Sequence, residues 1–320
     1  MMKHLRCLLT ILFACSVHLA MAADDETFVF MPQWTAQAQF AGYYVAEAKG
    51  FYREAGLKVK IVHPTSTQLS MKSLIRNECH ATTIQLCEAM EMIDDGNPLV
   101  NILQTSMNNA MVIVSARGVN PLTQKGARVG IWSVGFGQLA FCMDKKEHLN
   151  YRWEPFAQNV SLFVAGALDA TIAMSYNEYY QLIQAGLEIS EKAVYRFSDH
   201  DYNVQGDGVY MKRSYYEKHP DQAKRFAQAS RKGWEWAAAH PEEALAIVMK
   251  YVKRDKIETN QVMQRLMLKE VLRLQVDRES KKREFRLRPD MVRKASRLMV
   301  ECGVLKREVT YEDLIVRNKK

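Results

Sequence analysis

The sequence has 320 residues, with 44 Lys and Arg against 36 Asp and Glu and a formal net charge of +8 at pH 7. Hydrophobic residues make up 48% and charged residues 25%, and the chain is long enough for two compact lobes with separate cores. Much of the basic excess lies in the last third of the chain, without interleaved aromatic residues or a groove-reading motif, so we expect no nucleic-acid partner.

Residues 1–22 are typical of a cleaved signal peptide. Lys3 and Arg6 precede a mostly apolar run, and Ala20-Met21-Ala22 supplies the small residues of a cleavage site. We therefore expect secretion into the periplasm. A lipid anchor on Cys15 is the alternative, because the preceding residues resemble a lipobox. No later segment reaches the roughly 20 apolar residues that span a bilayer.

Four cysteines follow the predicted leader, at positions 79, 87, 142 and 302. None belongs to a C-x-x-C pair, so we expect no metal site. Cys79 and Cys87 could form a disulfide in an oxidising compartment, and the other interpretation is buried free thiols.

The first third of the chain alternates between strand and helix patterns. Residues 27–31 and 58–62 have strand character, and a helical periodicity over 40–49 lies between them before two glycines interrupt it. Further elements are expected at 67–76 (helix), 81–86 (strand), up to 94 (helix), 99–104 (strand) and 111–115 (strand). Alternation of this kind predicts a mostly parallel sheet covered by helices.

The pattern restarts at residues 127–132, which suggests a second lobe. Strands are expected at 151–154 and 170–175, with helices toward 146 and around 160–166. A strand at 208–211 then returns the chain to the first lobe, and the remainder is helical, with His219-Pro220 and His240-Pro241 opening helices. We expect lobe one to comprise residues 23–113 plus 208–320, and lobe two residues 114–207.

A ligand site is predicted where strands end, because ligands of open α/β sheets bind beyond the carboxyl ends of the strands. A polar and aromatic cluster around residues 33–44 follows the first strand, and a loop around Asp207 returns to lobe one. The predicted ligand-binding residues are Gln33, Trp34, Gln39, Tyr43, Thr67, Gln85, Asn108, Ser133, Phe136, Gly137, Asn177, Glu178 and Asp207.

Several of these residues have a second interpretation. Trp34 could stack on a ligand or only pack. Tyr43 and Tyr44 are adjacent on a helix and cannot face the same way, so one of them should lie in the core. Asn177 and Glu178 could pair with a ring N–H and an exocyclic amine, or serve as a helix N-cap with an acidic first turn.

At several segments the chain resembles the periplasmic substrate-binding proteins of the aliphatic-sulfonate and thiamine-pyrimidine type. The segments are Gln33-Trp34 with Phe40 to Gly56 (FAGYYVAEAKGFYREAG), Gly126 to Trp132 (GARVGIW), Asn177-Glu178, and Phe226 to Trp236 with His240-Pro241-Glu242-Glu243-Ala244. The resemblance implies an α/β, bilobal type II periplasmic-binding-protein fold. Two mostly parallel sheets flanked by helices would hold a ligand cleft between them, closing by hinges near Met111 and Gly208.

The same family contains the thiamine pyrimidine synthase, which consumes an active-site histidine and uses pyridoxal phosphate held by a lysine. The corresponding segment here, residues 82–88, has neither residue type, and no cysteine run occurs between 190 and 210. We therefore expect a non-catalytic protein without a cofactor. The histidines are scattered and no hydrolase or metalloprotease motif is present, so we interpret them as surface or capping residues.

The function that the resemblance implies is capture of a small organic ligand, a pyrimidine thiamine precursor, for an ABC permease. A sulfonate-type anion is the alternative ligand, for which Arg117 and Arg128 are the nearby cations. An extracytoplasmic sensor that docks on a membrane kinase and a synthase-like enzyme are the alternative functions.

Overall fold

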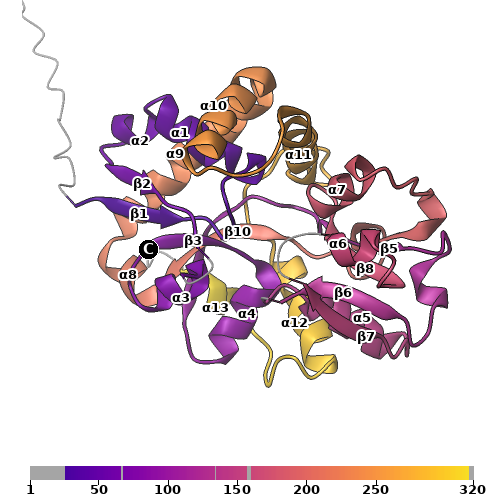
Figure 1. The fold of residues 1–320 in the computed structure, drawn as a ribbon. Helices are drawn as coiled ribbons and strands as arrows, with labels where there is room; N and C mark the ends of the chain where they lie inside the picture. The colour runs from indigo at the N-terminus through magenta and orange to yellow at the C-terminus, as the bar shows by residue number, and fades with distance from the viewer. Residues whose placement is uncertain (1–25, 66–67, 134, 157–159, 317–320) are drawn as a thin grey trace, which may run out of the picture.

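Two β-sheets, each flanked by helices, form two lobes that lie side by side (Figure 1). The structure is a computed structural model and describes residues 26–65, 68–133, 135–156 and 160–316. The predicted signal peptide and Thr67 lie outside the described residues. Within the described residues no helix is both long and apolar enough to traverse a bilayer.

The sheet of the first lobe has five strands in the order β2-β1-β3-β10-β4. They are β1 (Phe28–Met31), β2 (Val59–Ile61), β3 (Ala81–Gln85), β4 (Leu99–Gln104) and β10 (Asp207–Lys212). β1 runs parallel to β2 and β3, while β10 is antiparallel to β3 and β4. The expected βαβ unit is confirmed, and the sheet is mixed because β10 enters from the other lobe.

The sheet of the second lobe has the order β7-β6-β8-β5-β9. It contains β5 (Met111–Ser115), β6 (Arg128–Trp132), β7 (Arg152–Phe156), β8 (Ala170–Met174) and β9 (Val194–Arg196). β6 is parallel to β7 and β8, and β5 is antiparallel to β8 and β9. β9 was not predicted, since three residues at a sheet edge carry too short a pattern to read.

The first lobe contains the 3-10 turn η1 (Ala38–Phe40) and the helices α1 (Ala41–Ala48), α2 (Phe51–Glu54), α3 (Ser70–Ile75) and α4 (Leu86–Asp94). The second lobe contains η2 (Pro121–Thr123), α5 (Gln138–Lys146), α6 (Ser161–Val164), α7 (Glu178–Gln184), η3 (Glu191–Ala193) and η4 (Phe197–Asp199). The C-terminal helices are α8 (Arg213–Lys218), α9 (Pro220–Ala239), α10 (Pro241–Arg254), α11 (Gln261–Leu274), α12 (Pro289–Glu301) and α13 (Tyr311–Leu314). His219 and His240 are the N-caps of α9 and α10, as predicted.

Helices α1 and α9 approach each other very closely, and two glycines make this possible. A Cβ at Gly233 would lie 2.0 Å from the carbonyl oxygen of Gly42, and a Cβ at Gly42 would lie 2.2 Å from the Trp234 ring. Trp234 is buried and meets Tyr43 edge to face at 5.6 Å between ring centroids. This contact fixes α1 on the lobe, and with it the loop over residues 32–40 that precedes the helix.

Tyr43 and Tyr44 are both buried, with 1% and 0% of their surface exposed. One of them was expected in the core and both lie there, so Tyr43, which was predicted to bind the ligand, does not line the pocket. Tyr43 packs against Phe30 and Trp234, whereas Tyr44 stacks on Tyr251 of α10 at 3.9 Å. Helices cover both sides of α1, so adjacent positions are buried against different neighbours. The four cysteines of the described chain are free thiols.

The lobes are joined by two crossing segments that lie side by side. Thr105 to Ala110 follows β4, and residues 200–206 precede β10. The backbone N–H of Gly206 donates to the carbonyl of Ser106 at 3.2 Å, and the side chain of Asn203 accepts from the N–H of Asn109 at 3.0 Å. The C-terminal helices add to this connection, because α11 contacts α7 and α12 contacts both α4 and α5 (Figure 1).

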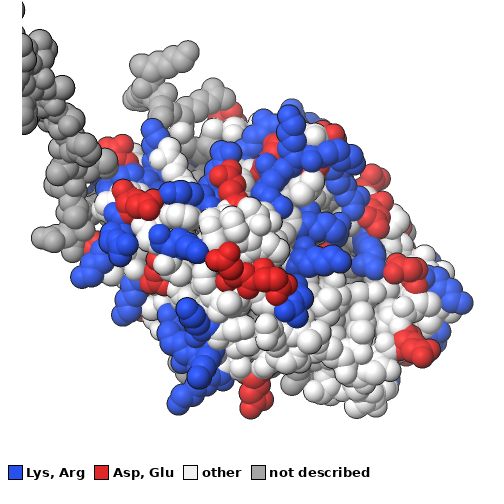
Figure 2. Space-filling model, turned by 90° about the horizontal axis from the view of Figure 1, so that it is seen from above, with Lys and Arg blue, Asp and Glu red and all other residues white. Residues whose placement is uncertain are grey.

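The basic excess is distributed among acidic residues on the helices. Figure 2 shows Lys and Arg interspersed with Asp and Glu over the face seen from above, together with an area that lacks charged side chains. Exposed ion pairs such as Arg231 with Glu235 and Arg265 with Glu242, at 2.8 Å each, illustrate the mixing on α9 to α11. Pairs of this kind are typical of a solvated helix face and contribute at most about 1 kcal/mol each.

Candidate ligand-binding site

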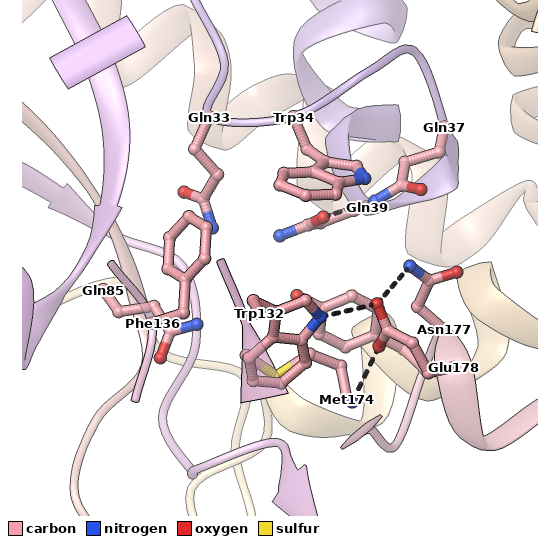
Figure 3. A pocket seen from close by; sticks show the side chains of 11 residues that line it. Gln33, Trp34, Gln37, Gln39, Gln85, Trp132, Phe136, Met174, Asn177 and Glu178 are labelled. Carbon is pink, nitrogen blue, oxygen red and sulfur yellow. Dashed lines mark hydrogen bonds between the residues drawn. The ribbon is translucent and has the colours of Figure 1, made fainter. Parts of the chain in front are cut away.

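A pocket with a free volume of about 320 Å³ lies between the two sheets. Figure 3 shows its side chains, which come from both lobes. Seven predicted site residues line it, namely Gln33, Trp34, Gln39, Gln85, Phe136, Asn177 and Glu178. Gln37, Trp132, Met174 and Tyr176 complete the lining.

On the first-lobe side, glutamine amides converge on one buried carboxylate. Asp207 Oδ1 accepts from Gln33 Nε2 at 3.1 Å, and its Oδ2 accepts from Gln39 Nε2 at 2.7 Å. Gln37 Nε2 in turn donates to Gln39 Oε1 at 2.6 Å. Burial raises the pKa of Asp207, while the two glutamine N–H donors act in the opposite direction. The network leaves Gln33 Oε1 buried without a hydrogen-bond partner.

Trp34 is held in place through its backbone by a half-buried histidine. His63 Nδ1 lies 2.6 Å from the carbonyl oxygen of Trp34, and His63 Nε2 lies 2.7 Å from the hydroxyl of Tyr44. Since a carbonyl only accepts, Nδ1 carries the proton and the Tyr44 hydroxyl donates to Nε2. Burial lowers the pKa of His63 to about 4, which keeps the ring neutral at pH 7. The interpretation of His63 as a surface residue was therefore wrong.

On the second-lobe side, Glu178 is held by three N–H donors. Its Oε1 accepts from Trp132 Nε1 and from Asn177 Nδ2, each at 3.1 Å, and its Oε2 accepts from the backbone N–H of Met174 at 2.9 Å. Burial raises the pKa of Glu178 against the effect of these donors. The carboxylate lines the pocket and at the same time fixes the Trp132 indole.

Asn177 is the N-cap residue of α7, and Glu178 stands in its first turn, as the second interpretation of this pair predicts. The Asn177 side chain makes no capping hydrogen bond. Instead its Oδ1 accepts from Gln181 Nε2 at 3.0 Å, one turn further along the helix. The pair therefore begins the helix and also lines the pocket, and its contact with a ligand stays a prediction.

Aromatic rings from both lobes bound the pocket. Figure 3 shows the Trp34 indole on one side of the cavity and the Trp132 indole on the other. The Phe136 ring lies edge to face with both, at centroid distances of 6.1 Å from Trp34 and 6.4 Å from Trp132. A cavity bounded by ring faces suits a flat ligand, since stacking and edge contacts contribute about 0.5–1.5 kcal/mol each beyond burial.

The charge balance of the site is acidic. None of the 11 lining side chains is basic. Burial raises the pKa of Tyr176, and the carboxyl groups of Asp207, Glu178 and Glu88 raise it further. Glu88 is itself buried, which raises its pKa well above the usual range, and its Oε2 has no hydrogen-bond partner.

The other predicted site residues lie elsewhere. Tyr43 is in the core of the first lobe, and Asn108 donates from its amide to the carbonyls of Leu274 and Val276 beside the crossing segments. Ser133 is exposed at the end of β6, and Gly137 is the N-cap of α5, against Ile131. None of these four lines the pocket. Asp207 does not line the pocket either, but its carboxylate accepts hydrogen bonds from Gln33 and Gln39, which line it.

The four lining residues absent from the prediction could have been found in part. Trp132 is the last residue of a predicted strand and Gln37 belongs to the polar cluster before α1. Met174 and Tyr176 flank the end of β8, next to Asn177. The rule that places ligands beyond strand ends points to all three segments. It does not say which of the alternating side chains face the other lobe.

The sequence model of the NMT1/THI5-like family matches residues 37–244, which is more than half of the chain. The chain belongs to this family. The match includes η1, α1, the whole second lobe and the start of α10, and therefore most of the residues that line the pocket.

Curated relatives of this family member are binding and thiamine-related proteins. The formylaminopyrimidine-binding protein of Halalkalibacterium halodurans is 25% identical over 268 residues, 77% of this chain and 78% of that protein. A Haemophilus influenzae protein named for thiamine biosynthesis is 25% identical over 235 residues, 71% of this chain and 74% of its own. Identity at this level leaves the ligand of this chain open.

Solved structures share the fold. The periplasmic aliphatic sulphonate-binding protein of Escherichia coli superimposes with a TM-score of 0.65 at 13% identity, over 92% of this chain and 93% of that one. The α/β periplasmic-binding-protein fold is thus shown, with two mixed sheets flanked by helices. The relatives and structural neighbours are mostly binding proteins, several of them ligand-binding components of ABC import systems.

Proposed function

We propose that this protein acts outside the cytoplasm, where it binds a flat heteroaromatic molecule rich in hydrogen-bond donors and delivers it to an ABC permease. The proposed ligand is an aminopyrimidine precursor of thiamine. The observation that carries the proposal is the combination of facing indoles with an acidic pocket lacking a basic side chain. The curated relative named for formylaminopyrimidine binding supports the same ligand class.

The buried acceptors of the pocket match an aminopyrimidine. Gln33 Oε1 is buried and without a partner, so an amine or a ring N–H could supply the missing hydrogen bond. Satisfying a buried acceptor in this way recovers about 1–3 kcal/mol. The carboxyl groups of Asp207 and Glu178 lie behind the glutamine and indole donors, and their negative field favours a ligand with positive polar edges.

The lack of a basic side chain in the pocket lining argues against a sulfonate or another anion as the ligand. An anion would face the Glu178 carboxyl group without an arginine or lysine from the lining. Arg117 and Arg128, the cations considered for this ligand, both pair with Asp169, at 2.9 Å and 3.8 Å. Neither lines the pocket. An anion brought into this site would lose its hydration without gaining a cationic partner.

The proposal is tested by calorimetry and thermal melting of the protein with aminopyrimidines, thiamine and small sulfonates. A ligand at 100 times its Kd adds about 2.7 kcal/mol to the free energy of unfolding, which raises the melting temperature measurably. We expect stabilisation by an aminopyrimidine and none by a sulfonate. Stabilisation by sulfonates alone would overturn the proposal.

A tryptophan pair supplies the matched variants. Trp34→Ala should weaken aminopyrimidine binding by more than about 1 kcal/mol, roughly fivefold, while the melting temperature of the free protein changes little. Trp236→Ala removes a partly buried tryptophan of α9 that does not line the pocket, and it should leave the affinity unchanged. Equal affinities in the Trp34 variant and the wild type would exclude the stacking role.

A further inference from the structure

Three helices from distant parts of the chain meet at one corner between the lobes, and each carries a cysteine. α4 of the first lobe, α5 of the second lobe and the C-terminal helix α12 contact one another in every pair (Figure 1). Cys87 lies on α4, Cys142 lies on α5, and Cys302 is the C-cap of α12. None of these thiols lines the pocket, so the proposed function leaves them without a role.

Cys142 and Cys302 approach each other across the contact between α5 and α12. The Cys142 thiol donates to the backbone carbonyl of Leu298 at 3.8 Å, and the backbone N–H of Cys302 donates to the same oxygen at 3.1 Å. Burial raises the pKa of Cys142, the neighbouring Cys302 thiol raises it further, and the Lys145 ammonium acts in the opposite direction. The two thiols are therefore close enough to influence each other.

Two lysines of α5 hold the end of α12 beside Cys142. Lys145 Nζ donates to the backbone carbonyl of Cys302 at 3.1 Å, and Lys146 Nζ lies 3.8 Å from a carboxylate oxygen of Glu301. A disulfide joins residues whose Cα atoms lie less than about 7 Å apart. Contacts immediately next to both cysteines keep the two helices together at this position, as such a bond requires.

The segment that follows Cys302 is fixed to the first lobe. The backbone N–H of Lys306 donates to Asp94 Oδ2 at 2.9 Å, and Lys306 Nζ lies 3.1 Å from Asp95 Oδ1. Asp94 is the last residue of α4 and Asp95 is its C-cap. Cys142, in contrast, belongs to α5, which follows β6 of the second-lobe sheet. A covalent bond between Cys142 and Cys302 would therefore connect the two lobes.

The sequence left open a disulfide between Cys79 and Cys87, and the position of β3 excludes it. Cys79 precedes this strand and Cys87 follows it. The strand has five residues, Ala81–Gln85, so its ends lie about 13 Å apart. That separation exceeds the limit of about 7 Å between the Cα atoms of a disulfide.

We propose that Cys142 and Cys302 form a disulfide when the protein meets a disulfide oxidant, and that this bond ties the second lobe to α12. Compartments outside the cytoplasm, where the proposed function places the protein, favour such bonds. A cross-link that closes a long loop stabilises the folded protein mainly because it restricts the unfolded chain. The inference does not depend on which ligand the pocket binds.

Exposure sets the order in which the two thiols react. Both are free thiols in the structure, Cys302 partly exposed and Cys142 fully buried, so a small oxidant reaches Cys302 first. The Cys302 thiolate attacks one sulfur of the oxidant, the other leaves as a thiol, and a mixed disulfide remains. The Cys142 thiolate then attacks the Cys302 sulfur and expels the second half of the oxidant as a thiol. The protein loses two electrons and two protons, and the oxidant gains both.

Peptide mapping tests the pairing. The purified protein is incubated with oxidised glutathione under native conditions, alkylated and digested with trypsin. The tryptic peptides 129–145 and 298–306 carry Cys142 and Cys302. We expect these two peptides to be joined, and dithiothreitol should separate them. A link from 129–145 to the peptide that contains Cys87 would overturn the proposal, and so would alkylation of both Cys142 and Cys302.

Thermal melting tests the stabilisation. Oxidised wild-type protein should melt about 3–7 °C above its reduced form. Cys302→Ser should abolish this difference, and Cys79→Ala, the matched control, should retain it. Each variant is compared with its own reduced form, so a destabilising effect of the substitution itself cancels. A difference that persists in Cys302→Ser, or that is absent from the wild type, would overturn the proposal. Neither readout involves a ligand, so failure of the proposed function leaves this inference standing.

Discussion

Removing the Glu178 carboxylate should destabilise the free protein, because it leaves three N–H donors without their acceptor. In Glu178→Ala the indole of Trp132, the amide of Asn177 and the backbone of Met174 all lose a partner. A buried donor left unpaired costs about 1–3 kcal/mol, and the first two can turn toward water in the pocket, so we expect a loss of about 2–5 kcal/mol. Glu178→Gln retains one acceptor oxygen and should lose about 1–3 kcal/mol.

Urea unfolding of the free protein measures both losses, with the slope m as the check that the unfolded state is unchanged. Glu188→Gln, an exposed position just after α7, is the matched control and should lie within about 0.5 kcal/mol of the wild type. The control should be the most stable of the three variants, Glu178→Gln the next and Glu178→Ala the least stable. If Glu178→Ala has the same urea midpoint of unfolding as the wild type, the carboxylate does not anchor Trp132. The position of the Trp132 indole in the pocket would then have another origin.

Two further predictions concern the elements that position the first-lobe wall. His63 has a pKa of about 4 in the folded protein, below its ordinary value of 6.5, because it is buried. The unfolded chain therefore takes up the proton first, and stability should fall by about 3 kcal/mol as the pH drops from 6.5 to 4. His63→Gln should flatten this slope in urea titrations at several pH values, and an unchanged slope would assign it to other groups. Gly233→Ala places a methyl group 2.0 Å from the carbonyl oxygen of Gly42 and should cost about 1–3 kcal/mol, whereas Ala227→Gly on the same helix should cost no more than about 1 kcal/mol. Thermal melting that ranks the two variants in the opposite order would contradict the close packing of α1 on α9.

Most elements could be predicted from periodicity and chain-breaking residues. The strands at 99–104 and 111–115 have the predicted bounds. His-Pro pairs mark the starts of α9 and α10, since proline is favoured at the first position of a helix. The direction of β10 and the existence of β9 could not be read in this way. Strand direction depends on which lobe the chain comes from, and three edge residues carry no pattern.

For the candidate site, the sequence predicted the contributing segments more accurately than the individual side chains. Segments that follow β1, β3, β6 and β8 do contribute to the pocket. After β6 the polar residue Ser133 was chosen, whereas the indole of Trp132 lines the cavity, as does the ring of Tyr176 after β8. Hydrophobic rings at strand ends look like core residues in a sequence. Only the position of the opposite lobe shows that they face a ligand.

The sequence by itself determined the family, the alternation of strands and helices, and the segments from which a ligand site is built, because these depend on local periodicity and residue type. The tertiary structure decided the chemistry of the pocket. It brought Gln33 and Asp207 together across 174 positions of sequence, placed Trp132 Nε1 on the Glu178 carboxylate across 46, and set the His63 ring against the backbone carbonyl of Trp34. Such contacts depend on how two lobes pack, and the charge balance that favours a donor-rich ligand over an anion exists only in that packed arrangement.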